Sequence, residues 1–137
     1  MDNTIAVEII TPDETAYTDN VTFLLARASD GDIGILPGHE PLAAALSVWP
    51  VKVRRPDGED HLIAVFGGFM EVTPKKITLI TPYCELPEAI DVERAERAKT
   101  RAEKRLESRL ITVDTARAEG ALRRSLVRLK VSGRIPL

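Results

Sequence analysis

The spacing of hydrophobic and polar positions changes part-way along the chain, near residue 87. Before this point, apolar residues alternate with polar ones in short runs, which is typical of half-buried β-strands. Beyond it, they recur every three or four positions, as on one face of an amphipathic helix. The sequence therefore predicts an α+β fold with two domains, residues 1–86 and residues 87–137.

The first domain is predicted to be an antiparallel β-sandwich. Its apolar runs are short, and turn residues such as Arg55-Pro56-Asp57-Gly58 separate them at intervals of about eight to twelve residues. Gly67-Gly68 has no side chains and predicts a sharp bend or bulge. Strands are expected at Ile5–Ile10, Val21–Ala26, Val48–Arg54, His61–Phe66, Phe69–Val72 and Lys76–Thr81.

The second domain is predicted to be an antiparallel hairpin of two helices. Asp114 is the expected N-cap of the second helix, which should end near Ser132-Gly133. Each helix carries one apolar stripe, and the two stripes are expected to face each other. The first stripe is Ala95, Ala98, Ala102 and Leu106, and the second is Ala118, Leu122, Leu126 and Leu129.

The helical hairpin should be held together weakly. Its first stripe is mostly alanine, and each buried methyl group contributes only about 0.8 kcal/mol. Gly120, within the second helix, costs roughly 1 kcal/mol relative to alanine. Because ordering the chain also costs entropy, we expect both docked and opened helices to be accessible.

The stretch Gly31–Leu42 reads Gly-Asp-Ile-Gly-Ile-Leu-Pro-Gly-His-Glu-Pro-Leu and is too rich in Gly and Pro to be a helix. Ile33, Ile35 and Leu36 are apolar enough to be held against a core. We therefore predict a rigid, shaped loop that contacts another molecule. The alternative is a tight connection within the sandwich.

Charge is distributed unevenly along the chain. Residues 1–87 carry 6 Lys/Arg against 13 Asp/Glu, whereas residues 88–137 carry 13 against 8, although the net charge is only −2. An acidic body with a basic tail predicts two parts that have different partners. Aromatic residues are only 4% of the chain, which argues against a base-stacking surface for single-stranded nucleic acid.

The sequence predicts no membrane span, secretion signal or internal disulfide. No apolar run approaches the roughly 18 residues that a spanning helix needs. The first residues lack a basic start and an apolar stretch, and the single cysteine, Cys84, has no partner of its own kind. We expect a soluble chain in a reducing compartment that reaches a membrane only through a partner.

Neither a catalytic site nor a metal site is predicted. Cys84 has no base near it in the sequence, and there is no Gly-x-Ser-x-Gly elbow. His39-Glu40 resembles the start of a zinc-binding helix, but Ala43 stands where a second histidine would be needed. His39 and His61 are the only histidines, so a site with several histidine ligands is excluded.

Arginines are the most suggestive feature of the tail. Arg94, Arg97, Arg101 and Arg105 fall on neighbouring turns of the first helix, and Arg123, Arg124 and Arg128 lie on the second. One interpretation is a solvent face laced with salt bridges, aided by neighbours such as Glu93 and Glu103. A second is an anion site, because guanidinium groups match carboxylate and phosphate geometry. A third is a duplex nucleic-acid surface, which the acidic body would disfavour.

Three segments in the same order resemble motifs of the epsilon subunit of F-type ATP synthases. The loop Gly31–Leu42 resembles its Gly-acidic-x-Gly-Ile-x-Pro-Gly-His-x-Pro-Leu motif. Gly67–Val72 (Gly-Gly-Phe-Met-Glu-Val) is similar to its Gly-Gly-x-x-Glu-Val segment, and Ile90–Ala95 (Ile-Asp-Val-Glu-Arg-Ala) to its Ile/Leu-Asp-x-x-Arg-Ala segment. The resemblance spans residues 5 to about 130. It is closer to the bacterial form than to the chloroplast homologue.

The resemblance implies a sandwich of about ten strands followed by a helical hairpin. It implies a non-catalytic subunit on the rotor, or central stalk, which couples proton-driven rotation to ATP synthesis. The sandwich would bind the gamma subunit and the ring of c subunits, with Asp32 near the c-ring and His39 near gamma. The helices would extend along gamma and restrain ATP hydrolysis, setting Arg123, Arg124 and Arg128 against the alpha and beta subunits of the catalytic head.

The resemblance also implies that ATP can bind the folded hairpin as a regulatory ligand, with no cofactor required. Arginines of both helices would hold the phosphates, and acidic groups would meet the adenine or ribose. The place implied is the cytoplasmic face of the bacterial plasma membrane, or the stromal face of the thylakoid in a plastid version. The rival function is a free-standing nucleotide-sensing module with an unrelated partner. The ATP-binding residues implied are Glu85, Asp91, Arg94, Arg101, Arg124 and Arg128.

Overall fold

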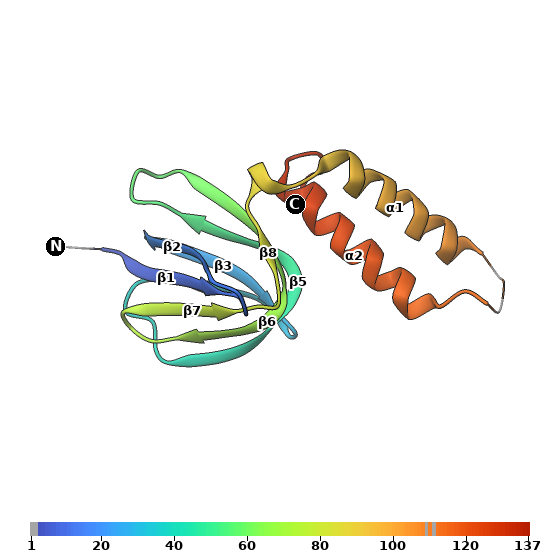
Figure 1. Cartoon of the computed structure of the whole chain (residues 1–137). Coiled ribbons are helices and arrows are strands. Elements are labelled where there is room, and N and C mark those ends of the chain that lie inside the picture. The colour runs from blue at the N-terminus through green and yellow to red at the C-terminus, as the bar shows by residue number, and fades with distance from the viewer. Residues whose placement is uncertain (1–2, 109, 111) are drawn as a thin grey trace. The chain divides into compact units, whose positions relative to one another are not determined.

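The computed structural model describes residues 3–108, 110 and 112–137. The chain forms two compact units, Met1–Cys84 and Glu85–Leu137, which are described separately below. The division falls close to the domain boundary expected from the sequence. The first unit is built of β-strands and the second of helices (Figure 1).

The strands of the described residues pair in the order β2-β1-β7-β6-β5-β3-β4, with β8 on β6. All neighbouring pairs whose register is defined are antiparallel, except that β1 and β7 are parallel. The sequence pattern predicted antiparallel strands throughout and did not anticipate this parallel pair. The strands are β1 (Ile5–Ile10), β2 (Thr15–Val21), β3 (Phe23–Ala28), β4 (Gly31–Ile35), β5 (Leu42–Arg54), β6 (Asp60–Val72), β7 (Lys76–Ile80) and β8 (Cys84–Glu85).

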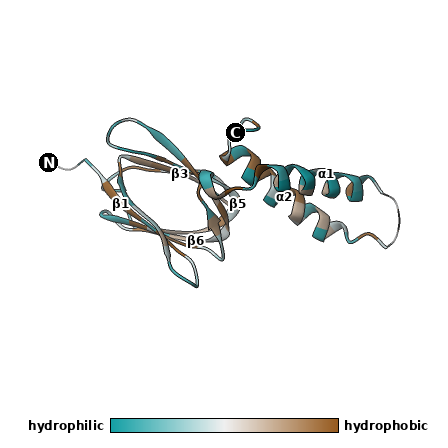
Figure 2. Cartoon of the chain, turned by 45° about the horizontal axis from the view of Figure 1, so that its top comes forward, coloured by the Kyte–Doolittle hydropathy of each residue, from teal (hydrophilic) through white to brown (hydrophobic). Residues whose placement is uncertain are grey.

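The β-sandwich arises because two long strands take part in both layers. β5 and β6 have 13 residues each, and one part of β6 pairs with β7 while the far end of β5 pairs with β3. Figure 2 shows β3 in one layer and β1 and β6 in the other. The structure therefore contains eight strands in the described residues rather than the ten that the resemblance implies, since each long strand serves two layers.

The bend of β6 lies at Gly67-Gly68, as the sequence predicts. Both glycines have positive φ, +85° and +105°. A Cβ atom on Gly68 would lie 2.0 Å from the carbonyl oxygen of Ile80, so the neighbouring strand packs where a side chain would otherwise be. Here only glycine meets both the backbone angle and the close approach.

The core follows the alternation read from the sequence, most clearly in β1, where Ile5, Val7 and Ile9 are buried. Three strands were missed: β2, β4 and the two-residue β8. The expected loop Gly31–Leu42 is wrong in its first part, because Gly31–Ile35 pairs with β3 as strand β4. Ile35 is buried as expected, but Leu36 is 60% exposed and does not pack in the core. The turn proper runs only from residue 36 to residue 41.

The helical unit contains α1 (Val92–Glu107) and α2 (Thr115–Val131), preceded by the short 3₁₀ turn η1 (Pro87–Ala89). The two helices lie side by side (Figure 1). Asp91 caps α1 by accepting a hydrogen bond from the backbone N–H of Arg94 at 3.1 Å. Asp114 caps α2 in the same way, through Arg117 at 3.0 Å, as the sequence predicts.

The predicted stripes form the inner faces of the hairpin. Three residues of the stripes are at most 3% exposed: Ala95, Ala102 and Ala118. The remaining stripe residues are buried or half-buried. α1 is largely hydrophilic outside its stripe, whereas α2 is mixed (Figure 2). Small side chains let the helices approach closely but remove little apolar area from water.

Candidate functional site: a basic helical face and two surfaces of the β-unit

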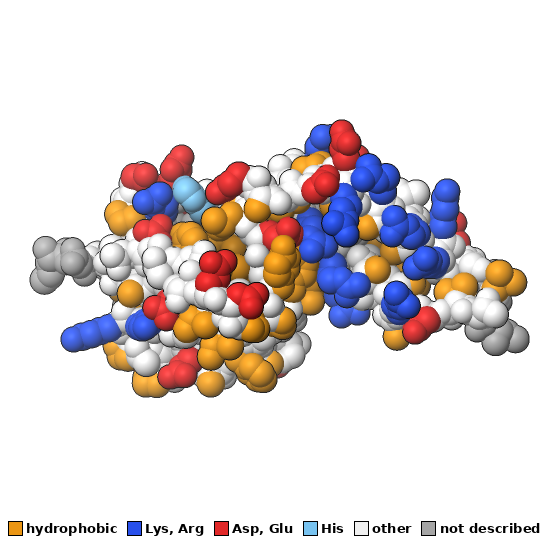
Figure 3. Space-filling model, in the orientation of Figure 1, with side chains coloured by type: hydrophobic (Ala, Val, Ile, Leu, Met, Phe, Trp, Pro, Cys, Tyr) orange, Lys and Arg blue, Asp and Glu red, His pale blue; other side chains and the backbone are white. Residues whose placement is uncertain are grey.

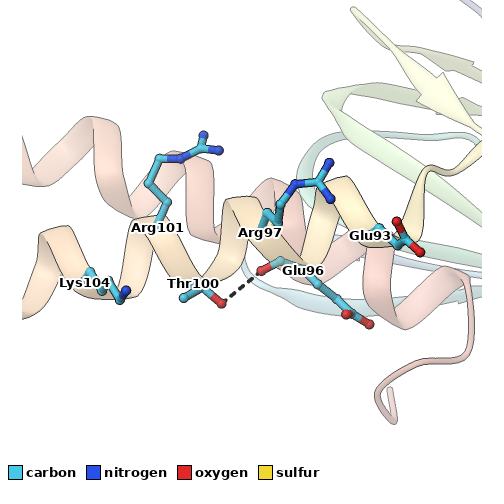
Figure 4. A pocket seen from close by; sticks show the side chains of 6 residues that line it. All are labelled: Glu93, Glu96, Arg97, Thr100, Arg101 and Lys104. Carbon is cyan, nitrogen blue, oxygen red and sulfur yellow. Dashed lines mark hydrogen bonds between the residues drawn. The ribbon is translucent and has the colours of Figure 1, made fainter.

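Four arginines form a row along α1. Residues three, four and four positions apart lie on one side of a helix, so Arg94, Arg97, Arg101 and Arg105 fall within a narrow arc. Figure 4 shows Arg97 and Arg101 extending from the same side of α1, and Glu96 from another. The row lies roughly a quarter-turn or more away from the buried alanine stripe.

α2 carries a matching row. Arg117, Arg124 and Arg128 are seven and four positions apart and therefore share one side of the helix. Each row is displaced from its own buried stripe by a similar angle in the same rotational sense. Because the helices are antiparallel, the two rows lie on the same face of the hairpin. We call this surface the arginine face; it comprises Arg94, Arg97, Arg101, Arg105, Arg117, Arg124 and Arg128.

Basic side chains gather over the helical unit in the view of Figure 3, where acidic ones are few. Within the described part of the chain, ion pairs of the helices include Lys99 with Glu103, Arg134 with Glu96, and Arg128 with Glu85. The Glu93–Arg97 pair that would support a salt-bridged solvent face is not among them. The Lys99–Glu103 and Arg134–Glu96 pairs are of the kind that the salt-bridged interpretation expects, so the anion site stays a prediction.

Glu85 and Arg128, both in the implied ATP-binding set, are brought together. The Nε–H of Arg128 donates to Oε1 of Glu85, and the two side chains are 29% and 13% exposed. Asp91, a third member, uses its carboxylate as the helix cap, with Oδ1 bound to the N–H of Arg94. The other carboxylate oxygen of Asp91, Oδ2, takes no part in this cap and can accept a hydrogen bond from another partner.

The remaining members divide between the helices. Arg94 and Arg101 lie in the row of α1, and Arg124 lies in the row of α2. Arg124 Nη1 folds back along its own helix, 3.3 Å from the position a Cβ atom would take on Gly120. Arg123 is exposed but lies about 100° around α2 from Arg124, outside the arginine face.

In the β-unit, Asp32 belongs to a three-residue arrangement across neighbouring strands. Arg27 and Asp32 are directly opposite each other in the β3–β4 pairing, and Arg27 Nε donates to Asp32 Oδ1 at 2.8 Å. The guanidinium of Arg27 also lies over the ring of Trp49, with Cζ 3.6 Å from the ring centroid. Its hydrogen bond to Asp32 lowers the pKa of that carboxyl below its usual range. Arg27 thus fixes Asp32 on an exposed edge of the sheet as a carboxylate.

His39 lies in the turn between β4 and β5, which is tied to the rest of the β-unit by the backbone. The N–H of Gly38 donates to the carbonyl of Pro74 at 3.0 Å, and Gly38 has φ of +81°. Nδ1 of His39 lies 2.7 Å from the carbonyl oxygen of Glu40, and a carbonyl can only accept, so Nδ1 carries a proton. The ring is half-buried and Leu36 stands exposed beside it in the sequence.

Residues 4–87 match the family described as "ATP synthase, Delta/Epsilon chain, beta-sandwich domain". Residues 88–133 match the companion description, "ATP synthase, Delta/Epsilon chain, long alpha-helix domain". Together the two matches cover nearly the whole chain. The chain belongs to the ATP synthase delta/epsilon family.

Relatives in this family are similar along their full length. The ATP synthase epsilon chain of Bacillus velezensis is 45% identical over 130 residues, which cover 95% of this chain and 98% of that protein. The epsilon chain of Nitratidesulfovibrio vulgaris is 38% identical over 133 residues, covering 97% and 98%. A chain of the Euglena gracilis mitochondrial ATP synthase shares the fold, with a TM-score of 0.81 at 23% identity over 96% of this chain and 82% of that chain.

This member of the delta/epsilon family has an apolar row that the sequence analysis missed. Ala45, Phe69, Ile80 and Ile10 are successive cross-strand neighbours on β5, β6, β7 and β1. Phe69 is 66% exposed and Ile80 53% exposed, so their side chains face outward. The signal was present in the sequence: Phe69 and Ile80 alternate with the core residues Met70 and Leu79. We call these four residues the apolar row.

An open depression on the helical unit does not coincide with the implied ATP-binding set. It has a volume of about 630 Å³, is open, and runs along α1 alone (Figure 4). Only Arg101 belongs to both. It mixes acidic and basic groups and is therefore a poorer anion site than the arginine face. Its lining residues are Glu93, Glu96, Arg97, Thr100, Arg101 and Lys104.

Among the residues that the structure describes, no three His, Cys, Asp or Glu side chains are grouped so as to hold a metal ion. Over the same residues, neither helix has the length and apolar character that crossing a membrane requires.

Proposed function

We propose that this chain is the epsilon subunit of an F-type ATP synthase, a non-catalytic part of the rotor, or central stalk. The observation that carries the proposal is full-length similarity to bacterial ATP synthase epsilon chains, up to 45% identity over 98% of their length. That similarity extends over both units, so it does not favour a free-standing nucleotide-sensing module. In this role the chain couples proton-driven rotation to ATP synthesis.

The β-unit supplies the contacts to the rest of the rotor. The apolar row offers Phe69 and Ile80 to the gamma subunit, because exposed aromatic and aliphatic side chains lose unfavourable hydration when a partner covers them. His39, on its backbone-anchored turn, extends the gamma contact. Asp32, held as a carboxylate by Arg27, faces the ring of c subunits. Polar and apolar contacts on one rigid unit suit a subunit that transmits torque.

The helical unit restrains ATP hydrolysis. Its apolar stripes bury little area, so the hairpin can open at a small cost in free energy. When it opens, α2 carries Arg123, Arg124 and Arg128 to acidic loops of the alpha and beta subunits. Contacts of this kind hold the catalytic head in one rotational position. The basic charge of the unit, against the acidic charge of the β-unit, supports this division of roles.

ATP stabilises the closed hairpin. The phosphates contact Arg94 and Arg101 of α1 together with Arg124 and Arg128 of α2, so the ligand bridges the helices. Glu85 and Asp91 meet the ribose or adenine. At a hundred times its dissociation constant, such a ligand stabilises the bound form by about 2.7 kcal/mol. This is comparable with the small closure energy of an alanine stripe, so ATP acts as a latch.

The assembled complex is membrane-associated, as its bacterial relatives imply. The chain itself joins the membrane through its partners, on the cytoplasmic face in a bacterial cell. No nucleic acid is needed for this role.

Co-expression with the gamma subunit tests the rotor assignment directly. The full chain should co-purify with gamma through size-exclusion chromatography in a complex of one copy of each. Recovery of the two proteins in separate peaks would overturn the assignment. Isothermal titration of ATP into the isolated chain tests the latch separately, since heat should saturate at one nucleotide per chain. The absence of heat at millimolar ATP would reject nucleotide binding and leave the rotor assignment untouched.

A further inference from the structure

The arginine face is larger than the ATP-binding set requires. Four of its arginines, Arg94, Arg101, Arg124 and Arg128, are accounted for by a bridging triphosphate. Three others, Arg97, Arg105 and Arg117, lie on the same face. None of these three forms an ion pair with another of the described residues, and Arg105 and Arg117 are exposed. An exposed cation without a counter-ion, beside others of the same sign, raises the electrostatic free energy of the empty face.

The arginines of the two helices are arranged as a ladder. α1 and α2 are antiparallel, so residues at similar distances from the connection between them lie at about the same level. Arg105 is then about level with Arg117, whereas Arg101 with Arg124, and Arg97 with Arg128, are each offset by three residues, or about 4.5 Å along the axis. Neighbouring rungs on α1 are four residues apart, which is about 6 Å along the helix axis. The three rungs therefore extend about 12 Å along α1, from Arg97 to Arg105, and about 17 Å along α2, from Arg117 to Arg128.

Charge along the ladder is not balanced by the helices themselves. Glu85 pairs with Arg128, at one end of the ladder. The acidic residues of the middle of α1 and of α2, Glu96, Glu103 and Glu119, lie on other sides of the helices. Lys99 and Glu103 pair with each other, away from the ladder. The rungs at Arg101/Arg124 and Arg105/Arg117 thus face solvent with a line of positive charge.

We propose that this ladder binds a linear chain of phosphates longer than a triphosphate, such as inorganic polyphosphate. The proposal rests on the anion site of the proposed function and extends it toward the hairpin connection. A triphosphate at Arg94, Arg101, Arg124 and Arg128 leaves the rung Arg105/Arg117 empty. A longer chain places phosphate oxygens at every rung, where each guanidinium can donate two parallel hydrogen bonds. Nucleic acid fits less well, because aromatic side chains for stacking are scarce.

The primary test compares ligands on the full chain by isothermal titration at fixed ionic strength. The probes are ATP, inorganic tripolyphosphate and inorganic polyphosphate of long chain length. Long-chain polyphosphate should bind at least tenfold more tightly than tripolyphosphate. Equal affinities would overturn the proposal. A single-stranded oligonucleotide that bound as tightly as polyphosphate at equal charge would also overturn it, since the recognition would then not be specific to phosphate chains.

Variants locate the extra contacts. Arg105→Gln and Arg117→Gln should remove most of the advantage of polyphosphate over tripolyphosphate and leave ATP binding unchanged. Lys99→Gln is the matched control, because it removes the same charge from the same unit at a position off the ladder. An equal loss in this control would show attraction to overall charge only and would contradict the ladder. Circular dichroism confirms that each variant retains its helices.

The outcomes separate this proposal from the ATP latch. If ATP binds but long-chain polyphosphate gains nothing over tripolyphosphate, the ladder fails and the latch stands. If polyphosphate binds tightly while ATP does not, the latch fails and the ladder stands. If neither ligand binds, both the latch and the ladder fail. The assignment to the rotor is unaffected, because co-purification with the gamma subunit tests it separately.

Discussion

The carboxylate of Glu85 binds the Nε–H of Arg128, 43 residues further along the chain, and so ties the segment before α1 to the last turns of α2. The Glu85 side chain is only 13% exposed. This pair places an internal carboxylate on the arginine face. If the proposed phosphate ligand binds at Arg128, it therefore competes with this intramolecular carboxylate.

Replacing Glu85 should strengthen phosphate binding and weaken the fold. In Glu85→Gln, Arg128 loses its counter-ion, so we expect tripolyphosphate to bind several-fold more tightly. The helical unit should lose about 1–3 kcal/mol of stability, since an ion pair between two mostly buried side chains is lost. Titration calorimetry and thermal unfolding measure the two effects. Weaker tripolyphosphate binding would contradict the competition.

The same variant separates two roles for Glu85 in the ATP latch. A contact between Glu85 and the ribose would make Glu85→Gln lose ATP affinity while it gains tripolyphosphate affinity. Arg128→Gln is the companion variant, and it should weaken both ligands.

The pair Arg27–Asp32 should matter for assembly more than for stability. Arg27→Gln removes the guanidinium that holds Asp32 and lies over Trp49. We expect a several-fold loss in binding to the gamma and c-ring rotor, with little change in unfolding temperature, because exposed ion pairs contribute little. The matched control is Arg54→Gln, which removes a similar cross-strand pair with Asp60. If Arg54→Gln weakens binding to the rotor equally, the loss comes from the change in net charge and not from the Arg27–Asp32 pair.

The pH dependence of this pair has a definite sign. Arg27 lowers the pKa of Asp32, so the stabilisation is present above the unfolded pKa of aspartate and is lost as pH falls through the lower folded value. In Arg27→Gln the pKa of Asp32 should rise toward its usual value, which nuclear magnetic resonance titration of the carboxyl carbon measures. Trp49 is the only tryptophan, so its fluorescence reports the loss of the stacked guanidinium directly.

The apolar row should be a hot spot for gamma. Phe69→Glu places a charge at the most exposed aromatic position of the row, next to Ile80. We expect gamma binding to weaken tenfold or more, which is about 1.4 kcal/mol or more. Phe69→Leu keeps the surface apolar and should retain most of the affinity. Co-purification yields and titration of gamma measure both, and unchanged binding of Phe69→Glu would place the gamma contact elsewhere.

Local sequence patterns were sufficient for elements that depend on nearby residues. Three such predictions were confirmed: the helix cap at Asp114, the alternation of buried residues in β1 and the turn at Arg55–Gly58. Each depends on residues that are close together in the sequence. The motif resemblance identified the family, which the full-length relatives confirm. Arg94, Arg101, Arg124 and Arg128 were chosen from that resemblance, and the hairpin places their rows on one face.

Features that depend on distant pairing were missed. Gly31 and Gly34 favour a loop in the sequence, yet pairing with β3 overrides that preference and makes Gly31–Ile35 strand β4. The parallel pair of β1 and β7 joins residues some seventy positions apart, which no local pattern reveals. The apolar row and the Glu85–Arg128 pair are likewise products of tertiary structure.

The two glycines of the β6 bend should respond differently to the same change. Gly67→Ala strains a positive φ but meets only one atom, at 3.7 Å, so we expect a loss of about 1 kcal/mol. In Gly68→Ala the new Cβ would lie 2.0 Å from the carbonyl oxygen of Ile80, which forces the strands apart. We expect a loss above about 3 kcal/mol, or failure to fold. Denaturant unfolding of both variants measures the difference, and similar losses would contradict the close packing at Gly68.

The central claim is that the β-unit joins the rotor while the basic helices restrain ATP hydrolysis. The most direct measurement is the ATP hydrolysis rate of the assembled synthase containing either the full chain or a chain that ends after residue 86. The truncated chain should assemble with gamma as well as the full chain does, and hydrolysis should rise several-fold. Normal assembly with an unchanged hydrolysis rate would contradict the account.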